Sequence, residues 1–82
     1  DAPIMIQVAD CESELKPEAD RAQLGVDVGV FQINQVHLPE MAMLGLDRRV
    51  LRDNIAFARI LYDRAGTQPW YMSEYCWGRH LA

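Results

Sequence analysis

The sequence predicts a small, mainly α-helical domain with at most one short β-hairpin. Apolar residues recur at helical spacing in the stretches 4–11 and 50–62. The run that is rich in β-branched and aromatic residues, 28–33, is long enough for a hairpin strand and no more. With 82 residues, the chain has room for one compact domain, 1–82, and not for a second.

The first half of the chain is expected to contain one helix and one short strand. A helix is predicted from Pro3 to Glu12, because proline suits a first helical turn and Asp1 can cap it. Glu12 therefore ends this helix among apolar neighbours. The polar stretch 14–26 indicates a loop or short turns. Periodicity alone does not separate a short strand from a helix entry at 28–33.

The second half is expected to be helical throughout. Pro39 can start a short helix that runs through Met43, and Gly45 can stop it. Asp47 can cap the longest helix, and Gly66 can end it. The aromatic tail 69–77 is expected to pack as a last short helix. The longest helix carries one apolar stripe, formed by Val50, Leu51, Ile55, Ala58, Leu61 and Tyr62.

The composition is ordinary for a soluble globular protein and argues against nucleic acid as the main partner. Half of the residues are hydrophobic, 24% are charged and the net charge is −4, whereas phosphate binding needs clustered Lys and Arg. The longest basic run, Arg48-Arg49 with Arg52 close by, is interpreted as a solvated helix face. No stretch is long and apolar enough for a membrane span, and no signal peptide is visible.

Two cysteines, Cys11 and Cys76, are candidates for a disulfide. A bridge between them would close nearly the whole chain, and the chain-entropy model gives about 4 kcal/mol for such a loop. It would imply an oxidising compartment, extracellular or periplasmic. The alternative is a pair of free buried thiols in a cytosolic protein. His37 and His80 are isolated and are interpreted as surface or packing residues, so neither a metal site nor a cofactor is predicted.

Two carboxyl groups in unlike surroundings are the candidate chemistry. Glu12 ends an apolar stretch, and Asp27 opens the octet DVGVFQIN, residues 27–34. Cleavage of a glycosidic bond uses such a pair, with one carboxyl protonated and the other ionised. A carboxyl among apolar groups loses solvation when it ionises, which favours the protonated form that a general acid needs. The alternatives are a surface carboxylate for Glu12 and a turn residue ahead of Gly29 for Asp27.

The motif Cys11-Glu12-Ser13, followed by the octet, resembles the lysozyme-like superfamily. The octet is similar to the Asp-x-Gly-apolar-apolar-Gln-Ile-Asn stretch of animal c-type lysozymes. The Glu-Ser pair followed by Gly-apolar-apolar-Gln is similar to bacterial lytic transglycosylases. The resemblance implies a lysozyme-like α+β fold. Further similarities to bacterial and phage members extend over most of the chain: Asp53-Asn54-Ile55, Arg59-Ile60-Leu61-Tyr62, Gly66, Pro69-Trp70, Ser73 and Cys76-Trp77.

The resemblance implies cleavage of the β-1,4 bond between N-acetylmuramic acid and N-acetylglucosamine in peptidoglycan. Glu12 matches the general acid. Asp27 matches the second carboxylate of c-type lysozymes, which attacks the sugar or stabilises the oxocarbenium ion. In transglycosylases a single Glu serves as acid and then as base, and the 6-hydroxyl of the sugar closes a 1,6-anhydro ring. The reaction, hydrolysis or transglycosylation, therefore depends on what Asp27 does.

Two amides, Gln32 and Asn34, match positions that line the sugar cleft of the family. Amides suit sugars because each offers donors and an acceptor. If the stretch 28–34 is extended, both side chains point to the same face. The alternative for both is hydrogen bonding to the backbone.

Three more side chains are candidates for glycan binding. Tyr62 lies near the place where transglycosylases carry a cleft tyrosine, and Tyr71 can stack on a sugar ring. Ser13 is expected to orient Glu12 or the local backbone. The alternative for both tyrosines is packing in the core. A rival to the enzyme is a non-catalytic glycan-binding or structural module that keeps the fold, which the short cleft expected of so small a chain favours. The missing Ser-x-x-Gly-Ala ahead of Gly29 weakens the resemblance to the transglycosylase branch.

Overall fold

The computed structural model describes residues 2–20 and 23–81, and the side chains of residues 3–20 and 23–79; Asp1, the expected cap, lies outside them. It confirms a mainly helical chain with one short hairpin. The elements, with η for 3₁₀ helices, are α1 (Ala2–Ser13), β1 (Asp27–Val28), β2 (Ile33–Asn34), η1 (Gln35–His37), α2 (Leu38–Met43), α3 (Leu51–Ala65), η2 (Gln68–Ser73), α4 (Glu74–Trp77) and η3 (Gly78–Leu81).

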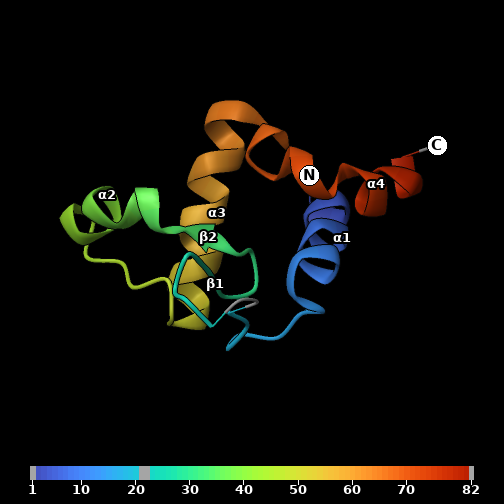
Figure 1. Ribbon diagram of the computed structural model, residues 1–82. Helices are drawn as coiled ribbons and strands as arrows, with labels where there is room; N and C mark the ends of the chain where they lie inside the picture. The colour runs from blue at the N-terminus through green and yellow to red at the C-terminus, as the bar shows by residue number, and fades with distance from the viewer. Residues whose placement is uncertain (1, 21–22, 82) are drawn as a thin grey trace.

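Helix α3 stands at the centre of the molecule (Figure 1). The hairpin lies beside it and leads to α2 on one side, while α1 and the C-terminal helices lie on the other side (Figure 1). α3 contacts η2, and α1 contacts both η2 and α4. The two ends of the chain therefore pack on each other.

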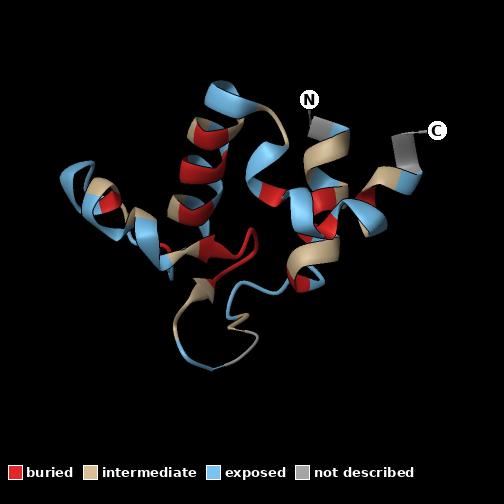
Figure 2. Cartoon of the chain, turned by 45° about the horizontal axis from the view of Figure 1, so that its top comes forward, coloured by how far each residue is buried: buried red, intermediate tan, exposed pale blue. Residues whose placement is uncertain are grey.

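A single hydrophobic core joins these parts. Figure 2 shows the buried residues gathered on the hairpin turn and along α3 and α1. Phe57 and Trp77 are among its largest fully buried side chains, and each such side chain stabilises the fold by about 1.5–3 kcal/mol. The core consists of Val8, Ala9, Val30, Phe31, Ile33, Met41, Phe57, Ala58, Leu61, Trp70 and Trp77.

A disulfide joins α1 to α4, as the sequence suggested. Cys11 and Cys76 are bonded across a sequence separation of 65, with their Cα atoms 6.0 Å apart. Because Glu12 follows Cys11 directly, the bridge holds the end of α1 that carries this carboxyl against the C-terminal helices.

The long helix α3 is rotated relative to the predicted stripe. Its buried residues are Asn54, Phe57, Ala58 and Leu61, which are spaced i, i+3, i+4 and i+7 on one face. Val50, Leu51 and Ile55 were expected on the buried face and are exposed. The helix has this orientation because the polar residue Asn54 faces the hairpin, where its amide forms hydrogen bonds with the backbone.

The helix also begins later than expected. Val50 occupies the N-cap position of α3 without a side-chain cap. Asp47, the predicted cap, instead accepts a hydrogen bond from the backbone N–H of Arg49 at 2.8 Å within the preceding turn. The end of the helix is as predicted, because Gly66 is the C-cap with a φ of 60°.

The hairpin depends on Asn54 for its shape. β1 and β2 are antiparallel, with Asp27 opposite Asn34. The Asn54 amide accepts from the N–H of Phe31 at 2.9 Å and donates to the carbonyl oxygens of Val28 and Arg48, each at 2.8 Å. Two-residue strands are too short to be stable alone, so these bonds from α3 hold the turn.

Gly29 permits this approach. Its φ is 90°, and a Cβ built there would lie 2.1 Å from Nδ2 of Asn54. Both properties exclude a side chain at this position. Gly29 therefore combines a close backbone approach with a positive φ.

Arg48 is buried, which corrects its interpretation as part of a solvated helix face. Its side chain is 6% exposed. The guanidinium donates to the carbonyl oxygens of Val26 at 2.9 Å and Ile33 at 2.8 Å, and also to that of Gly25. Burial lowers the pKa of Arg48, and the neighbouring charge of Arg49 lowers it further. The group remains a cation at neutral pH and ties the ends of the hairpin together.

Candidate active site

One cavity gathers most of the predicted site residues. It has a volume of about 220 Å³ and lies between the end of α1, the hairpin and η2. We call it the carboxyl cavity. Five of the seven residues predicted to act on or bind the glycan line it. Its lining consists of Glu12, Asp27, Gln32, Ile33, Asn34, His37, Leu61, Pro69, Trp70, Tyr71 and Met72.

Glu12 is held from the C-terminal side of the chain. The hydroxyl of Ser73 donates to Oε2 of Glu12 at 2.5 Å, and Nε1 of Trp77 donates to the oxygen of Ser73 at 3.0 Å. Ser73 is 9% exposed, and Glu12 itself is half-buried. Buried groups of the C-terminal helices therefore hold the carboxyl group of Glu12 where it lines the cavity.

Asp27 is held from within the hairpin. Nδ2 of Asn34, its partner across the two strands, donates to Oδ1 of Asp27 at 3.0 Å. Oδ1 of Asn34 accepts the N–H of Val36 at 2.9 Å and so caps η1. Asn34 therefore orients the second carboxyl and lies in the cavity wall at the same time.

Gln32 lies in the cavity wall for a reason other than the one predicted. Residues 29–32 form the turn of the hairpin rather than extended chain, and Gln32 has a φ of 48°. Its Nε2 donates to the carbonyl oxygens of Ala19 and Gly29, each at 3.0 Å. These two bonds use both amide hydrogens, so the carbonyl oxygen is the part of Gln32 suited to a ligand N–H or O–H.

Ser13 does not line the cavity. Its hydroxyl is buried and lies 3.0 Å from the carbonyl oxygen of Ala9 and 2.7 Å from that of Val30. It ties the last turn of α1 to the hairpin turn. This is the backbone-orienting role that was considered for it, and it is not direct contact with a ligand.

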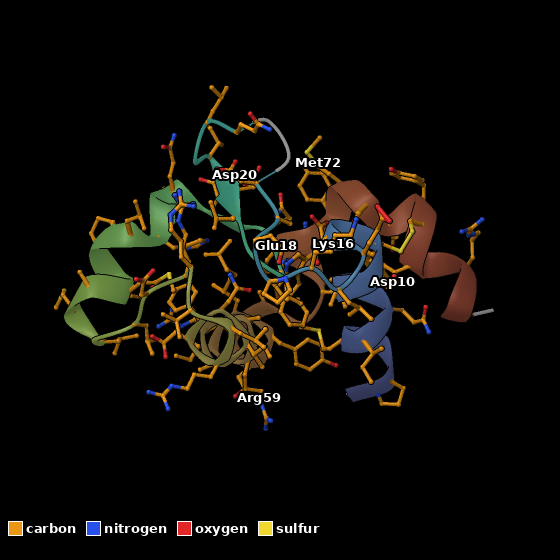
Figure 3. The ribbon with its side chains drawn as sticks, turned by 90° about the horizontal axis from the view of Figure 1, so that it is seen from below. Asp10, Lys16, Glu18, Asp20, Arg59 and Met72 are labelled. Carbon is orange, nitrogen blue, oxygen red and sulfur yellow. A yellow bond between two sulfur atoms is a disulfide. The ribbon has the colours of Figure 1, made fainter. Side chains whose placement is uncertain are left out.

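Tyr62 lies in a different hollow, which we call the apolar groove. Figure 3 places Arg59 of this groove and Met72 of the carboxyl cavity at opposite edges of the molecule. Tyr62 is half-buried and packs against the core, the alternative considered for it. The groove, of about 520 Å³, is lined by Met5, Ile6, Ala9, Leu15, Val30, Phe31, Ile55, Ala58, Arg59, Tyr62 and Asp63.

Among the polar residues at the site, His37 and Ser73 were not predicted. His37 lines the cavity while its ring packs on that of Phe57, with centroids 5.3 Å apart. Its position three residues after Asn34 was the available signal. Ser73 is 61 residues from Glu12. The signal for it was the cysteine pair, since Cys11 adjoins Glu12 and Cys76 follows Ser73 by one helical turn.

The mouth of the cavity is apolar and exposed. Tyr71 and Met72 both line it, and their side chains are 62% and 77% exposed. A flat ring and a flexible thioether beside two carboxyls suit a ligand with an apolar face and many hydroxyls. Sugars have these properties, because the C–H face of a ring packs on aromatic groups while its hydroxyls hydrogen-bond.

Comparisons with protein-family models, curated proteins and solved structures return no match to this chain. Among the described residues, no three His, Cys, Asp or Glu side chains gather where they could hold a metal ion. Within the same part of the chain, no helix is both long and apolar enough to cross a membrane. The resemblance to lysozyme-like proteins therefore rests on the sequence motifs alone.

Proposed function

We propose that this protein degrades peptidoglycan by cleaving the β-1,4 bond between N-acetylmuramic acid and N-acetylglucosamine. The observation that carries the proposal is the carboxyl cavity, into which Glu12 and Asp27 project from separate walls. Each carboxyl has its own hydrogen-bond donor, Ser73 for Glu12 and Asn34 for Asp27. Two carboxyl groups at one cleft are the usual equipment of a glycosidase.

In the proposed reaction Glu12 is the general acid. Its proton passes to the glycosidic oxygen as the C1–O bond breaks, and the departing sugar leaves as an alcohol. Positive charge develops on C1 and the ring oxygen. The ionised carboxylate of Asp27 stabilises this charge or forms a covalent bond to C1. Glu12, now ionised, then removes a proton from the water that attacks C1.

The same cavity also allows transglycosylation. In that reaction the 6-hydroxyl of the muramic acid residue attacks C1, and ionised Glu12 takes its proton. The product carries a 1,6-anhydro ring, and Asp27 contributes its negative charge without forming a bond. The two reactions share every step up to departure of the leaving sugar.

The decisive experiment compares the parent protein with Glu12→Gln on purified peptidoglycan. Glutamine keeps the size and the hydrogen bond from Ser73 but has no acidic proton. We expect release of soluble muropeptides to fall by about 10²–10⁴-fold, with an unchanged melting temperature. Release by the variant near the parent rate would remove Glu12 from the mechanism.

Mass spectrometry of the released fragments identifies the reaction. Reducing ends indicate hydrolysis, and 1,6-anhydro ends indicate transglycosylation. Asp27→Asn is the matched variant, because it keeps the shape of the side chain and removes its charge. If Asp27 forms a bond to C1, this variant loses nearly all activity; if it acts through charge alone, a partial rate remains.

A non-catalytic glycan-binding module is the second candidate, and one observation favours it. The exposed side chains of Tyr71 and Met72 line the cavity, and they suit contact with a sugar ring whether or not Glu12 acts as an acid. Such a module would retain insoluble glycan strands in a sedimentation assay and release no soluble fragments.

We also propose that the protein works outside the cytoplasm, in the extracellular space or the periplasm. The Cys11–Cys76 disulfide supports this setting, because such bonds persist in oxidising compartments. Peptidoglycan strands, the proposed partner, are found there as well.

A further inference from the structure

We propose that Ser73 is the positioning residue for Glu12 and decides which of its two carboxyl oxygens carries the catalytic proton. The proposal rests on the function proposed for the carboxyl cavity. Ser73 is not part of the lining of that cavity, so it would act on the reaction only through Glu12.

The hydroxyl of Ser73 has one hydrogen and three polar neighbours. Oε2 of Glu12 lies at 2.5 Å, the carbonyl oxygen of Trp70 at 3.1 Å and Nε1 of Trp77 at 3.0 Å. The indole nitrogen of Trp77 can only donate. It therefore occupies one lone pair of Ser73, and the hydroxyl hydrogen must point to one of the two oxygens.

Glu12 is the better acceptor of the two. Its oxygen is nearer, and a carboxylate accepts a stronger hydrogen bond than a neutral carbonyl. The carbonyl oxygen of Trp70 also lies 3.2 Å from the indole nitrogen of Trp77, which donates to it. The hydroxyl of Ser73 is thus directed to Oε2 of Glu12.

Because the hydroxyl hydrogen of Ser73 points to Oε2, the two carboxyl oxygens of Glu12 have different roles. Oε2 accepts the hydrogen bond from Ser73 whether or not the carboxyl is protonated. The proton that the general acid donates and later recovers is then carried by Oε1. A general acid must present its proton within hydrogen-bond reach of the leaving oxygen, and a fixed assignment of oxygens keeps it in that place throughout the cycle.

The groups that support Ser73 are buried and hydrogen-bonded. Trp77 and Trp70 are buried core residues, and Nε1 of Trp70 donates to the carbonyl oxygen of Phe31 at 3.0 Å. The Cys11–Cys76 bridge connects the chain next to Glu12 with the chain just after Ser73. The two segments that carry the donor and the acceptor are therefore joined by a covalent bond as well as by packing.

The first test measures kcat and KM on soluble oligomers of alternating N-acetylglucosamine and N-acetylmuramic acid. For Ser73→Ala we expect kcat to fall about 10- to 100-fold, because a small misplacement of a catalytic group has this cost, with KM nearly unchanged. The limb of the pH–rate profile that follows Glu12 moves to higher pH, since the ionised carboxylate loses a donor. Ser73→Thr, which keeps the hydroxyl, restores most of kcat.

The second test needs no activity. In protein with ¹³C-labelled glutamate, the carboxyl resonance of Glu12 is assigned by its loss in Glu12→Gln. We expect its titration midpoint to rise in Ser73→Ala. The matched control is Ser13→Ala, which removes a second buried hydroxyl, one that bonds only to the backbone; it lowers the melting temperature and leaves the midpoint of Glu12 in place.

The outcomes separate the two proposals. A Glu12 titration curve in Ser73→Ala that coincides with that of the parent would overturn the role of Ser73, and so would an unchanged kcat. If the parent protein releases no product while the titration moves as expected, the hydrogen bond is established and the proposed glycosidase function is rejected.

Discussion

The two walls of the carboxyl cavity are built in different ways. The Glu12 wall consists of α1, η2 and α4, and it is held by a disulfide and by the buried indole and hydroxyl groups of Trp77 and Ser73. The Asp27 wall consists of β1, β2 and η1, and it is held by hydrogen bonds to the backbone from Asn54 and Arg48. One wall joins the two ends of the chain, and the other is supported by Asn54 of α3 and by Arg48, which precedes that helix.

This difference shows how a small chain can position two carboxyls. The Asp27 wall has strands of two residues each, so its shape depends on polar side chains that satisfy its backbone. The Glu12 wall is helical, and its backbone bonds are satisfied within the helices. Its helices come from distant parts of the chain, and the disulfide connects them. A different kind of substitution should therefore destabilise each wall.

The largest effect is expected from removing the disulfide. The double variant Cys11→Ser, Cys76→Ser opens a loop closed across 65 residues, and we expect it to lose about 4 kcal/mol of unfolding free energy. Thermal unfolding and denaturant titration measure this. At temperatures where the variant is still folded, activity should also fall, because the Glu12 wall is loosened.

The parent protein treated with a thiol reductant is the control for that variant. Both should show the same lowered midpoint. A reduced protein that melts at the parent temperature would mean that packing alone holds the Glu12 wall.

A smaller but still large effect is expected from Gly29→Ala, which acts on the Asp27 wall. The added Cβ would lie 2.1 Å from Nδ2 of Asn54 and 2.9 Å from the carbonyl oxygen of Arg48. We expect a loss of about 3 kcal/mol, from backbone strain at positive φ and from displaced buried hydrogen bonds. The melting temperature measures it. Gly45→Ala is the matched control, because Gly45 also has a positive φ but nothing lies within 4 Å of its added Cβ.

The smallest effect is expected from removing an ion pair of α2, the helix that follows the Asp27 wall in the chain. Arg64 of α3 donates to both carboxylate oxygens of Glu40, at 3.0 and 2.5 Å. This hydrogen bond lowers the pKa of Glu40 from its ordinary value of 4.5. The stabilisation is therefore present above pH 4.5 and is lost as the pH falls through the lowered pKa.

Glu40→Gln tests this ion pair. We expect a slightly lower melting temperature than the parent at pH 7, a difference that shrinks with added salt because the pair is exposed. The difference should disappear in acid, below the pH at which Glu40 of the parent is protonated. A difference that persists there would mean that the side chain contributes by packing rather than by charge.

Much of the fold could be predicted because it follows from local pattern. Proline and glycine positions indicated both ends of α2 and the C-terminal end of α3, and the cysteine pair indicated the link between the ends of the chain. The orientation of α3 could not be predicted in this way. A hydrophobic stripe assumes that a buried face is apolar, whereas here Asn54 faces inward because the hairpin needs its amide.

The candidate site was predictable to the extent that it lies in one short stretch of sequence. Asp27, Gln32 and Asn34 belong to one hairpin, and Glu12 meets them across the cavity. Tyr62 was expected in the cleft from the resemblance to transglycosylases, but it lines the apolar groove instead. Ser73 was missed as a site residue because its partner lies at the other end of the chain. Arg48 was misjudged because the acceptors that keep its charge buried are backbone carbonyl groups, and these have no signature in the sequence.

The exposed thioether of Met72 makes the mouth of the carboxyl cavity sensitive to oxidation. Its side chain is 77% exposed, and conversion to the sulfoxide would replace an apolar group by a polar, chiral one. Oxidising surroundings keep the bridge between Cys11 and Cys76 closed, and they also promote this conversion. The conditions that preserve the disulfide therefore also favour oxidation of Met72 at the mouth of the carboxyl cavity.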